Sequence, residues 1–189
     1  MRLLLIGAPG SGKGTQATRL AEHFGLTHIS SGDLLRQHVV EGTDLGRAVQ
    51  AFVERGDLVP DGLVMDVLRK PVVAAGSSGG YVLDGFPRTV QQAEIAYVVA
   101  KELGVEAQVA VHLDVRREEL VRRLLARGRG SDDTEAVIDH RLEVYEEHTV
   151  PMLDYYAQRE ELVTVDGGRS TDEVSWALVS RLQQLRRVL

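Results

Sequence analysis

The sequence predicts an α/β fold in which a mostly parallel sheet of about five strands carries helices on both faces. Short apolar runs alternate with segments of helical spacing along the 189 residues, and this alternation is typical of parallel sheets. The first run, Arg2–Ile6, ends at Gly7, and helical spacing follows in Gln16–Phe24. A chain of this length can bury one good core, so we expect a single domain over residues 1–189.

Five apolar runs have the length of buried strands, and helical patterns separate them. Two segments fit the alternation poorly. Residues 30–59 are helical in pattern but contain no strand, and residues 127–133 are polar and contain glycine. We expect mobile inserts at 30–59 and 127–137. The predicted strands are Arg2–Ile6, Thr27–Ile29, Tyr81–Leu83, Val109–Leu113 and Leu162–Val165.

Two helices are expected to complete the C-terminal half of the domain. In residues 134–158 the apolar side chains recur on one face, which predicts a long helix that Pro151 kinks. In residues 172–189 the same spacing predicts a closing helix, with Ser170 or Thr171 as its N-cap.

Composition narrows the possible functions. The net charge of −6 argues against a general nucleic-acid surface, because phosphate backbones are bound by basic stripes. No apolar stretch approaches the ~20 residues of a membrane span, and no signal sequence is recognised, so we expect a cytoplasmic protein that does not bind membranes. The chain has no cysteine, which excludes disulfides and thiolate chemistry, and its six histidines form no metal-like cluster.

A glycine-rich loop between the first strand and the first helix predicts a phosphate site. Its glycines let backbone N–H groups converge on phosphate oxygens, and the helix N-terminus and a lysine add positive charge. A simple glycine-rich turn would explain the glycines but not the lysine at the mouth of the helix. The loop therefore predicts a P-loop NTPase-type sheet that binds ATP through Gly10, Ser11, Gly12, Lys13, Gly14 and Thr15.

Gly14 separates Lys13 from Thr15, so the strict Walker pattern fails by one position. This variant resembles the loop of nucleoside monophosphate kinases, and in particular of adenylate kinases.

A second motif, Asp84-Gly85-Phe86-Pro87-Arg88-Thr89, follows a strand and lies where α/β folds place ligands. There Arg88 can clamp a phosphate bidentately. Asp84 either holds water on Mg²⁺ or caps the next helix.

The resemblance implies a second nucleotide site for AMP. The segment Ser30–Arg36 is similar to the acceptor segment of adenylate kinases, although either serine there could simply cap a helix. In the family Pro87 follows a cis peptide and Gln92 meets the adenine edge; taken alone, Gln92 would be a solvated helix residue. The implied AMP-binding residues are Ser31, Arg36, Asp57, Leu58, Val59, Gly85, Phe86, Pro87, Arg88, Gln92, Arg129 and Arg141.

Arginines cluster late in the chain. By themselves Arg123, Arg127 and Arg129 would indicate a solvated basic patch. Beside two phosphate motifs they suit phosphoryl transfer, which needs cations from several sides. The resemblance places Arg123 and Arg127 on the donor side and Arg129 and Arg141 on a short lid without metal, and Arg127 and Arg129 could exchange roles. It also places Gly168 and Arg169 beside the donor adenine.

The implied activity is reversible transfer from MgATP to AMP, which gives two ADP, by a monomer that needs no general base. Mg²⁺ is expected as the cofactor, held mainly by phosphates and water, with Thr15 and Asp84 nearby. A UMP/CMP kinase of the same fold and a nucleotide-gated binding module without catalysis stay open as alternatives. The residues expected to be catalytic are Lys13, Arg88, Arg123, Arg129 and Arg141.

Overall fold

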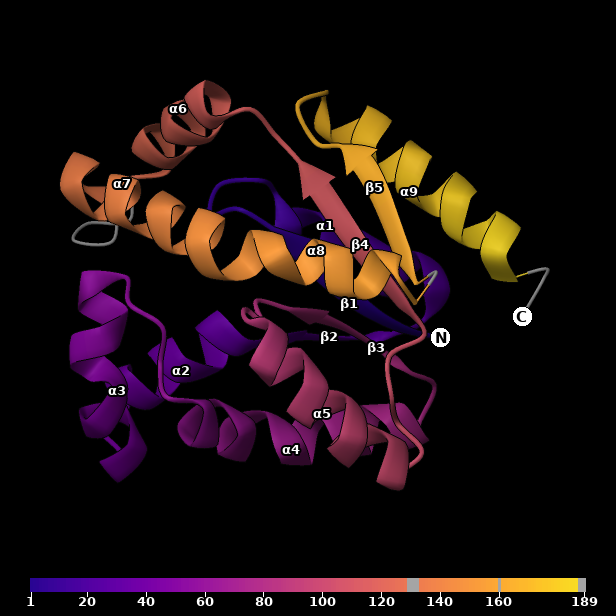
Figure 1. Cartoon of the computed structure of the whole chain (residues 1–189), viewed down its shortest axis with the longest axis horizontal. Coiled ribbons are helices and arrows are strands. Elements are labelled where there is room, and N and C mark those ends of the chain that lie inside the picture. The colour runs from indigo at the N-terminus through magenta and orange to yellow at the C-terminus, as the bar shows by residue number, and fades with distance from the viewer. Residues whose placement is uncertain (129–132, 160, 187–189) are drawn as a thin grey trace.

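The computed structural model describes residues 1–128, 133–159 and 161–186, with no side-chain description at 186. Within these residues one sheet of five parallel strands runs in the order β2-β3-β1-β4-β5 (Figure 1). The predicted α/β fold is confirmed. The strands are β1 (Arg2–Gly7), β2 (Thr27–Ser30), β3 (Tyr81–Asp84), β4 (Val109–Asp114) and β5 (Leu162–Asp166).

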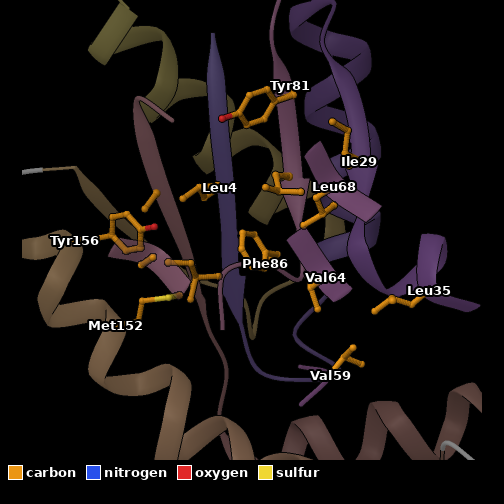
Figure 2. Close-up of a cluster of buried hydrophobic side chains, with 14 of the residues drawn as sticks. Leu4, Ile29, Leu35, Val59, Val64, Leu68, Tyr81, Phe86, Met152 and Tyr156 are labelled. Carbon is orange, nitrogen blue, oxygen red and sulfur yellow. The ribbon is translucent and has the colours of Figure 1, made fainter. Parts of the chain in front are cut away.

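Helices cover both faces of the sheet because alternate strand side chains point to opposite sides. Leu3 and Leu5 of β1 pack with α1 and α9 on one face, whereas Leu4 and Ile6 belong to the cluster under α4, α5 and α8 on the other. Figure 2 shows this second cluster, with Phe86 at its centre. The covering helices are α1 (Lys13–Phe24), α4 (Asp61–Ser77), α5 (Val90–Glu102), α8 (Val150–Ala157) and α9 (Thr171–Arg186).

In the described part of the chain, four more α-helices lie beyond the carboxyl ends of the strands, at the left of Figure 1. The stretch 30–59 forms two of them and adds no strand after Ser30, as predicted. A small apolar cluster that includes Leu120, Leu124 and Ile138 packs two others beneath the first loop. Among the described residues, no helix is both long and apolar enough to cross a bilayer. These four are α2 (Ser31–Val40), α3 (Asp44–Arg55), α6 (Arg117–Arg127) and α7 (Glu135–Val144).

The long helix predicted for residues 134–158 is continuous, but it is not uniformly α-helical. Thr134 caps α7, a π-helical turn covers Tyr145–Thr149, and α8 follows directly. The expected disturbance at Pro151 therefore lies just before the proline, in the π turn. Pro151 has no N–H to donate to the preceding turn, which is the physical reason for a change of hydrogen-bond pattern there.

The closing helix α9 begins one residue earlier than predicted. The Ser170 hydroxyl accepts a hydrogen bond from the Glu173 N–H at 3.4 Å, and the Glu173 carboxylate accepts one from the Ser170 N–H at 3.1 Å. This reciprocal pair is a capping box, so Ser170 rather than Thr171 is the cap. The cap fixes where the chain turns from β5 into α9, beside the phosphate loop.

Candidate active site

The phosphate loop joins β1 to α1 at the edge of the sheet where the strands end. Gly10 and Gly12 have φ of +83° and +93°, which favours glycine. A Cβ on Gly10 would lie 2.9 Å from Leu124 Cγ, so the loop also needs glycine to pack against α6. Gly12 is the N-cap of α1 and has no side chain to occupy the first N–H groups, which leaves them to an anion.

Lys13 is held at the mouth of α1 by the loop itself. Its Nζ donates to the carbonyl oxygens of Gly7 and Ala8, at 2.8 and 2.9 Å. Burial lowers the pKa of Lys13 to about 8; Asp84 opposes this shift, and Arg88 and further arginines reinforce it. The ammonium is thus poised beside the loop and surrounded by positive charge that an anionic ligand would neutralise.

The donor side of the site is built from α6 and the loop after β5. Arg123 Nε donates to Glu119 at 2.7 Å, and Arg123 Nη1 donates to the Gly167 carbonyl at 3.0 Å. Arg169 pairs with Asp166 at 3.1 Å, and the Gly168 N–H donates to the same carboxylate at 2.9 Å. Arg123 therefore connects α6 to the loop predicted to meet the donor adenine.

A second link, between α1 and α9, holds the loop after β5 against the phosphate loop. Gln16 is buried in α1, and its Nε2 donates to the Thr171 carbonyl at 3.0 Å. The Ser175 hydroxyl donates to Gln16 Oε1 at 2.7 Å. The first turns of α1 and α9 are therefore joined by a buried amide, which fixes the two ends of the donor site relative to each other.

Two arginines of the lid side share one buried carboxylate. Asp133 has no exposed side-chain surface, and it receives both Nε and Nη2 of Arg127, at 2.8 and 2.5 Å. Arg141 Nη1 lies 3.5 Å from the same carboxylate. The pairing sets the direction of both guanidinium groups toward the cavity. Arg129, predicted to act on phosphates, lies outside the described residues.

The acceptor loop follows β3, and its Phe86–Pro87 peptide is cis, as the resemblance implies. Phe86 points into the core, which anchors the loop (Figure 2). Arg88 Nε donates to the Gly85 carbonyl at 2.8 Å. Burial lowers the pKa of Arg88, with Asp84 opposing the shift. Asp84 is the last residue of β3 and does not cap α5, because Thr89 does.

The two serines at the start of α2 have different roles. Ser30 is the N-cap, and its hydroxyl accepts from the Asp33 N–H at 3.2 Å. Ser31 is buried, and its hydroxyl makes no hydrogen bond to the residues that the structure describes. A Cβ on Gly85 would lie 2.6 Å from that hydroxyl, so Ser31 faces the acceptor loop. Arg36, one turn later, pairs with Asp33 at 2.5 Å.

The remaining predicted acceptor residues surround a smaller cavity. Gln92 is only 4% exposed, contrary to the expectation for this residue taken alone. Its Oε1 accepts from the Arg88 N–H at 2.8 Å, and its Nε2 donates to Asp61 at 2.6 Å. Asp57 is bound to Arg55 and His140, both at 2.7 Å, and these hydrogen bonds lower its pKa. Its carboxylate therefore faces α7 as well as the cavity.

Two adjoining cavities bring the predicted residues together. The larger, about 1000 Å³, extends from the phosphate loop to Arg88; the smaller, about 70 Å³, adjoins it at Arg36, Leu58 and Gly85. Every predicted site residue within the described part of the chain lines one or both. Those on the larger cavity include Gly10–Thr15, Asp84, Pro87, Arg123, Arg127, Arg141, Gly168 and Arg169, and those on the smaller include Ser31, Asp57, Val59, Phe86 and Gln92.

Asp84 offers a position for a metal ion. One of its carboxylate oxygens is buried and has no hydrogen-bond partner among the described residues. It faces the start of α1, since a Cβ on Gly14 would lie 3.8 Å from the other oxygen. In the described part of the chain no three His, Asp or Glu side chains converge. One carboxylate beside a phosphate site fits Mg²⁺, which keeps waters and takes its other ligands from phosphates.

Several residues of the site were not predicted from the sequence. Gln16, Glu119, Asp133 and Thr149 line the larger cavity or hold residues that do. Gln16, Asp133 and Thr149 act on partners in other elements, so no local spacing indicates their roles. Glu119 had a usable signal, because its partner Arg123 lies one turn later in the same helix.

Comparisons with known proteins agree with this geometry. The family model for adenylate kinase matches residues 5–161. The chain is 46% identical to adenylate kinase 1 of Nostoc sp. over 181 residues, which cover 96% of this chain and 98% of that protein. It is 48% identical to an adenylate kinase of Synechococcus sp. with the same coverage, and 39% identical to one of Phocaeicola vulgatus over 98% of this chain and all of that protein. The chain therefore belongs to the adenylate kinase family.

Proposed function

We propose that this protein transfers the γ-phosphoryl group of ATP reversibly to AMP, which gives two molecules of ADP and maintains the balance of adenine nucleotides. The observation that carries the proposal is that Lys13, from the phosphate loop, and Arg88, from the acceptor loop, line one cavity of about 1000 Å³. Two separate phosphate-binding motifs on one cavity suit an enzyme that holds two nucleotides. The relatives named adenylate kinase support the same activity.

In the proposed mechanism ATP lies with its phosphates on Gly10–Thr15, and the AMP phosphate lies against Arg36 and Arg88. An oxygen of that phosphate attacks the γ-phosphorus in line, and the bond from the γ-phosphorus to the β–γ bridging oxygen breaks. No general base is needed, because the AMP phosphate is already largely ionised at pH 7. Catalysis then consists of positioning and of charge stabilisation by the catalytic set Lys13, Arg88, Arg123, Arg129 and Arg141.

Mg²⁺ is the proposed cofactor. When bound, it would supply positive charge against the negative charge that develops on the transferring phosphates. Asp84 would hold water of its coordination shell, and the Thr15 hydroxyl lies at the same end of α1. The unpaired oxygen of Asp84 supports this assignment. The chain's own arginines supply the remaining positive charge around the transferring group.

AMP is the proposed acceptor because Gln92 borders the smaller cavity. Its amide already holds Arg88 and Asp61, but an amide oxygen has a second lone pair and an amide nitrogen a second hydrogen. Those can meet an adenine edge without breaking either bond. Ser31, Asp57, Leu58 and Val59 complete this wall. A UMP/CMP kinase would share the phosphate chemistry and differ only here.

The acceptor and the activity are tested together. The protein is incubated with MgATP and, separately, with AMP, UMP, CMP or GMP, and nucleoside diphosphate formation is followed. We expect turnover that is fastest with AMP. Faster turnover with UMP or CMP would replace the acceptor assignment, and nucleotide binding without any turnover would indicate the binding module instead.

Arg88→Ala tests the acceptor-phosphate contact. Because an arginine on a transferring phosphoryl group can contribute about 1000-fold or more to the rate, we expect kcat/KM to fall by at least about that factor. The melting temperature should stay close to that of the wild type, since within the described residues the guanidinium makes a single hydrogen bond, to the Gly85 carbonyl. Near-native kcat/KM would contradict the assigned role.

Residues 30–59 and 127–137 are proposed to close over the two nucleotides and exclude water. Contacts between 30–59 and α7, the helix that begins within 127–137, support this: Asp57 binds His140, and a Cβ on Gly56 would lie 2.4 Å from Arg141 Cγ. The chain has no cysteine, so Gln50→Cys with Glu135→Cys gives a unique pair for fluorescent labels. We expect energy transfer to increase when MgATP and AMP are added together; an unchanged signal would contradict closure.

A cytoplasmic location and a monomeric state belong to the same proposal. ATP and AMP are both cytoplasmic metabolites, and the resemblance to adenylate kinases favours a monomer. Light scattering coupled to size-exclusion chromatography tests the second point: a single species near 20.8 kDa is expected, and a mass of twice that value would contradict it.

A further inference from the structure

The π turn Tyr145–Thr149 places two side chains on the larger cavity from the long C-terminal helix. Tyr145 lies with its hydroxyl 3.1 Å from His112 Nε2, which fixes the first residue of the turn against β4. Thr149, the last residue, is 6% exposed. π turns inside α-helices occur frequently at functional sites, because they change which side chains share a face.

The Thr149 hydroxyl has an unusual hydrogen-bond partner for a hydroxyl within a helix. In helices a threonine or serine hydroxyl commonly bonds the carbonyl four residues earlier. Among the described residues Thr18 donates to Gly14, Ser77 to Val73 and Ser175 to Thr171 in this way. Thr149 instead donates to the carbonyl oxygen of Arg88, at 2.8 Å and 61 positions away in the chain. This bond joins the long helix to the acceptor loop.

Both backbone polar groups of Arg88 are therefore held by side chains. Its carbonyl is bound by Thr149, and its N–H is bound by Gln92, which Asp61 holds in turn. The residue lies between β3 and α5, so neither a strand nor a helix fixes its backbone. These two hydrogen bonds fix the backbone on either side of the Arg88 Cα, from which the side chain extends.

We propose that Thr149 is a positioning residue for phosphoryl transfer: its hydroxyl fixes the Arg88 carbonyl and thereby places the guanidinium on the acceptor phosphate. The proposal rests on the proposed function, in which Arg88 contacts that phosphate. Without the hydroxyl bond the loop can shift while its anchor, Phe86, stays in the core (Figure 2). A misplacement of about 1 Å can lower a rate by about 100-fold.

Thr149→Val tests the proposal, because valine keeps the shape and removes the donor. With AMP varied at saturating MgATP, we expect kcat/KM for AMP to fall about 10- to 100-fold, with little change in KM for ATP. Thr149→Ser keeps the hydroxyl and should retain most of the activity. Thr149→Ala also removes the hydroxyl, without adding a methyl group, and takes the place of Thr149→Val in the test if the valine variant does not fold. Equal losses in the Ser and Val variants would overturn the proposal.

Tyr81→Phe is the matched control. The Tyr81 hydroxyl also donates to a backbone carbonyl, that of Val105, at 2.8 Å in a buried place, and Tyr81 lines neither cavity of the site. This variant should lose stability and keep the kinetic constants of the wild type. If it loses as much kcat/KM for AMP as Thr149→Val does, the effect is a general consequence of losing a buried hydrogen bond, and the proposal is wrong.

A double-mutant cycle decides whether Thr149 acts through Arg88. In an Arg88→Lys background the bidentate contact is already lost, so Thr149→Val should cost less than about threefold there. The same loss in both backgrounds would overturn the positioning role. No turnover by the wild-type protein with any acceptor would overturn the proposed function and this proposal together, whereas an active wild type with an unaffected Thr149→Val overturns this proposal alone.

Discussion

Binding of ATP should be accompanied by proton uptake at Lys13. In the free protein burial lowers the pKa of this lysine to about 8, and Arg88, Arg141 and Arg127 reinforce the shift against the opposing effect of Asp84. A bound triphosphate places negative charge beside the ammonium, which favours its protonated form. The pKa of Lys13 should therefore rise on binding, toward the usual value of about 10.4.

The size of the effect follows from this pKa. With a value of about 8, roughly one tenth of the free protein lacks the Lys13 proton at pH 7, about half at pH 8 and about nine tenths at pH 9. Binding should thus take up about 0.5 proton at pH 8 and about 0.9 at pH 9. The complex holds more protons than the free protein, so affinity falls as pH rises, by about tenfold between pH 7 and pH 9.

Calorimetric titration with a non-hydrolysable ATP analogue and Mg²⁺, in two buffers that differ in ionisation enthalpy, measures the uptake directly. Lys13→Arg is the control, because a guanidinium keeps its proton throughout this range. Nucleotide phosphates have lost their protons by pH 8 and contribute little. An uptake below about 0.2 proton at pH 9, or the same uptake in both proteins, would refute the reasoning.

Two stability measurements test the acceptor loop and the lid side. Gly85→Ala should lower the free energy of unfolding by about 1–3 kcal/mol and raise KM for AMP, because φ is +83° and the new methyl group meets the Ser31 hydroxyl. Gly25→Ala is the control, because φ is +66° there but the methyl group would enter open space, and KM for AMP should not change. A raised KM for AMP in the Gly25→Ala variant would contradict this reasoning. Asp133→Asn should cost about 2–4 kcal/mol in urea denaturation, because its fully buried carboxylate serves two arginines. The Asp172 side chain, which pairs with Arg19, is 88% exposed, so Asp172→Asn should cost less than about 1 kcal/mol. If Asp133→Asn and Asp172→Asn lose the same free energy of unfolding, burial of the Asp133 carboxylate does not add to its contribution.

Much of the fold was predictable because its signals are local. Each strand is a short apolar run, and each observed strand agrees with its predicted range to within a residue or two. In a parallel sheet the carboxyl ends of all strands meet at one edge, so the phosphate loop and the Asp84–Thr89 segment had to converge. The convergence of the two motifs therefore followed from strand direction alone.

Other features depend on partners that are distant in the chain. Gln92 taken alone indicated a solvated helix residue, yet it is buried because Asp61 and the Arg88 N–H lie against it. The change of helix geometry expected at Pro151 falls in the π turn before it, where Thr149 reaches another element. Spacing along one helix carries no information about such bonds.

The sequence by itself determined the chemistry: which residues form the phosphate loop, which arginines are available, and that the two phosphate motifs share one edge of a sheet. Those properties follow from residue identity and short-range geometry. Only the tertiary structure decided how the charges are held. The carboxylate of Asp133 orients two arginines, Thr149 and Gln92 fix Arg88, and burial lowers the pKa of Lys13, because desolvation and hydrogen-bond partners arise only when distant segments pack together.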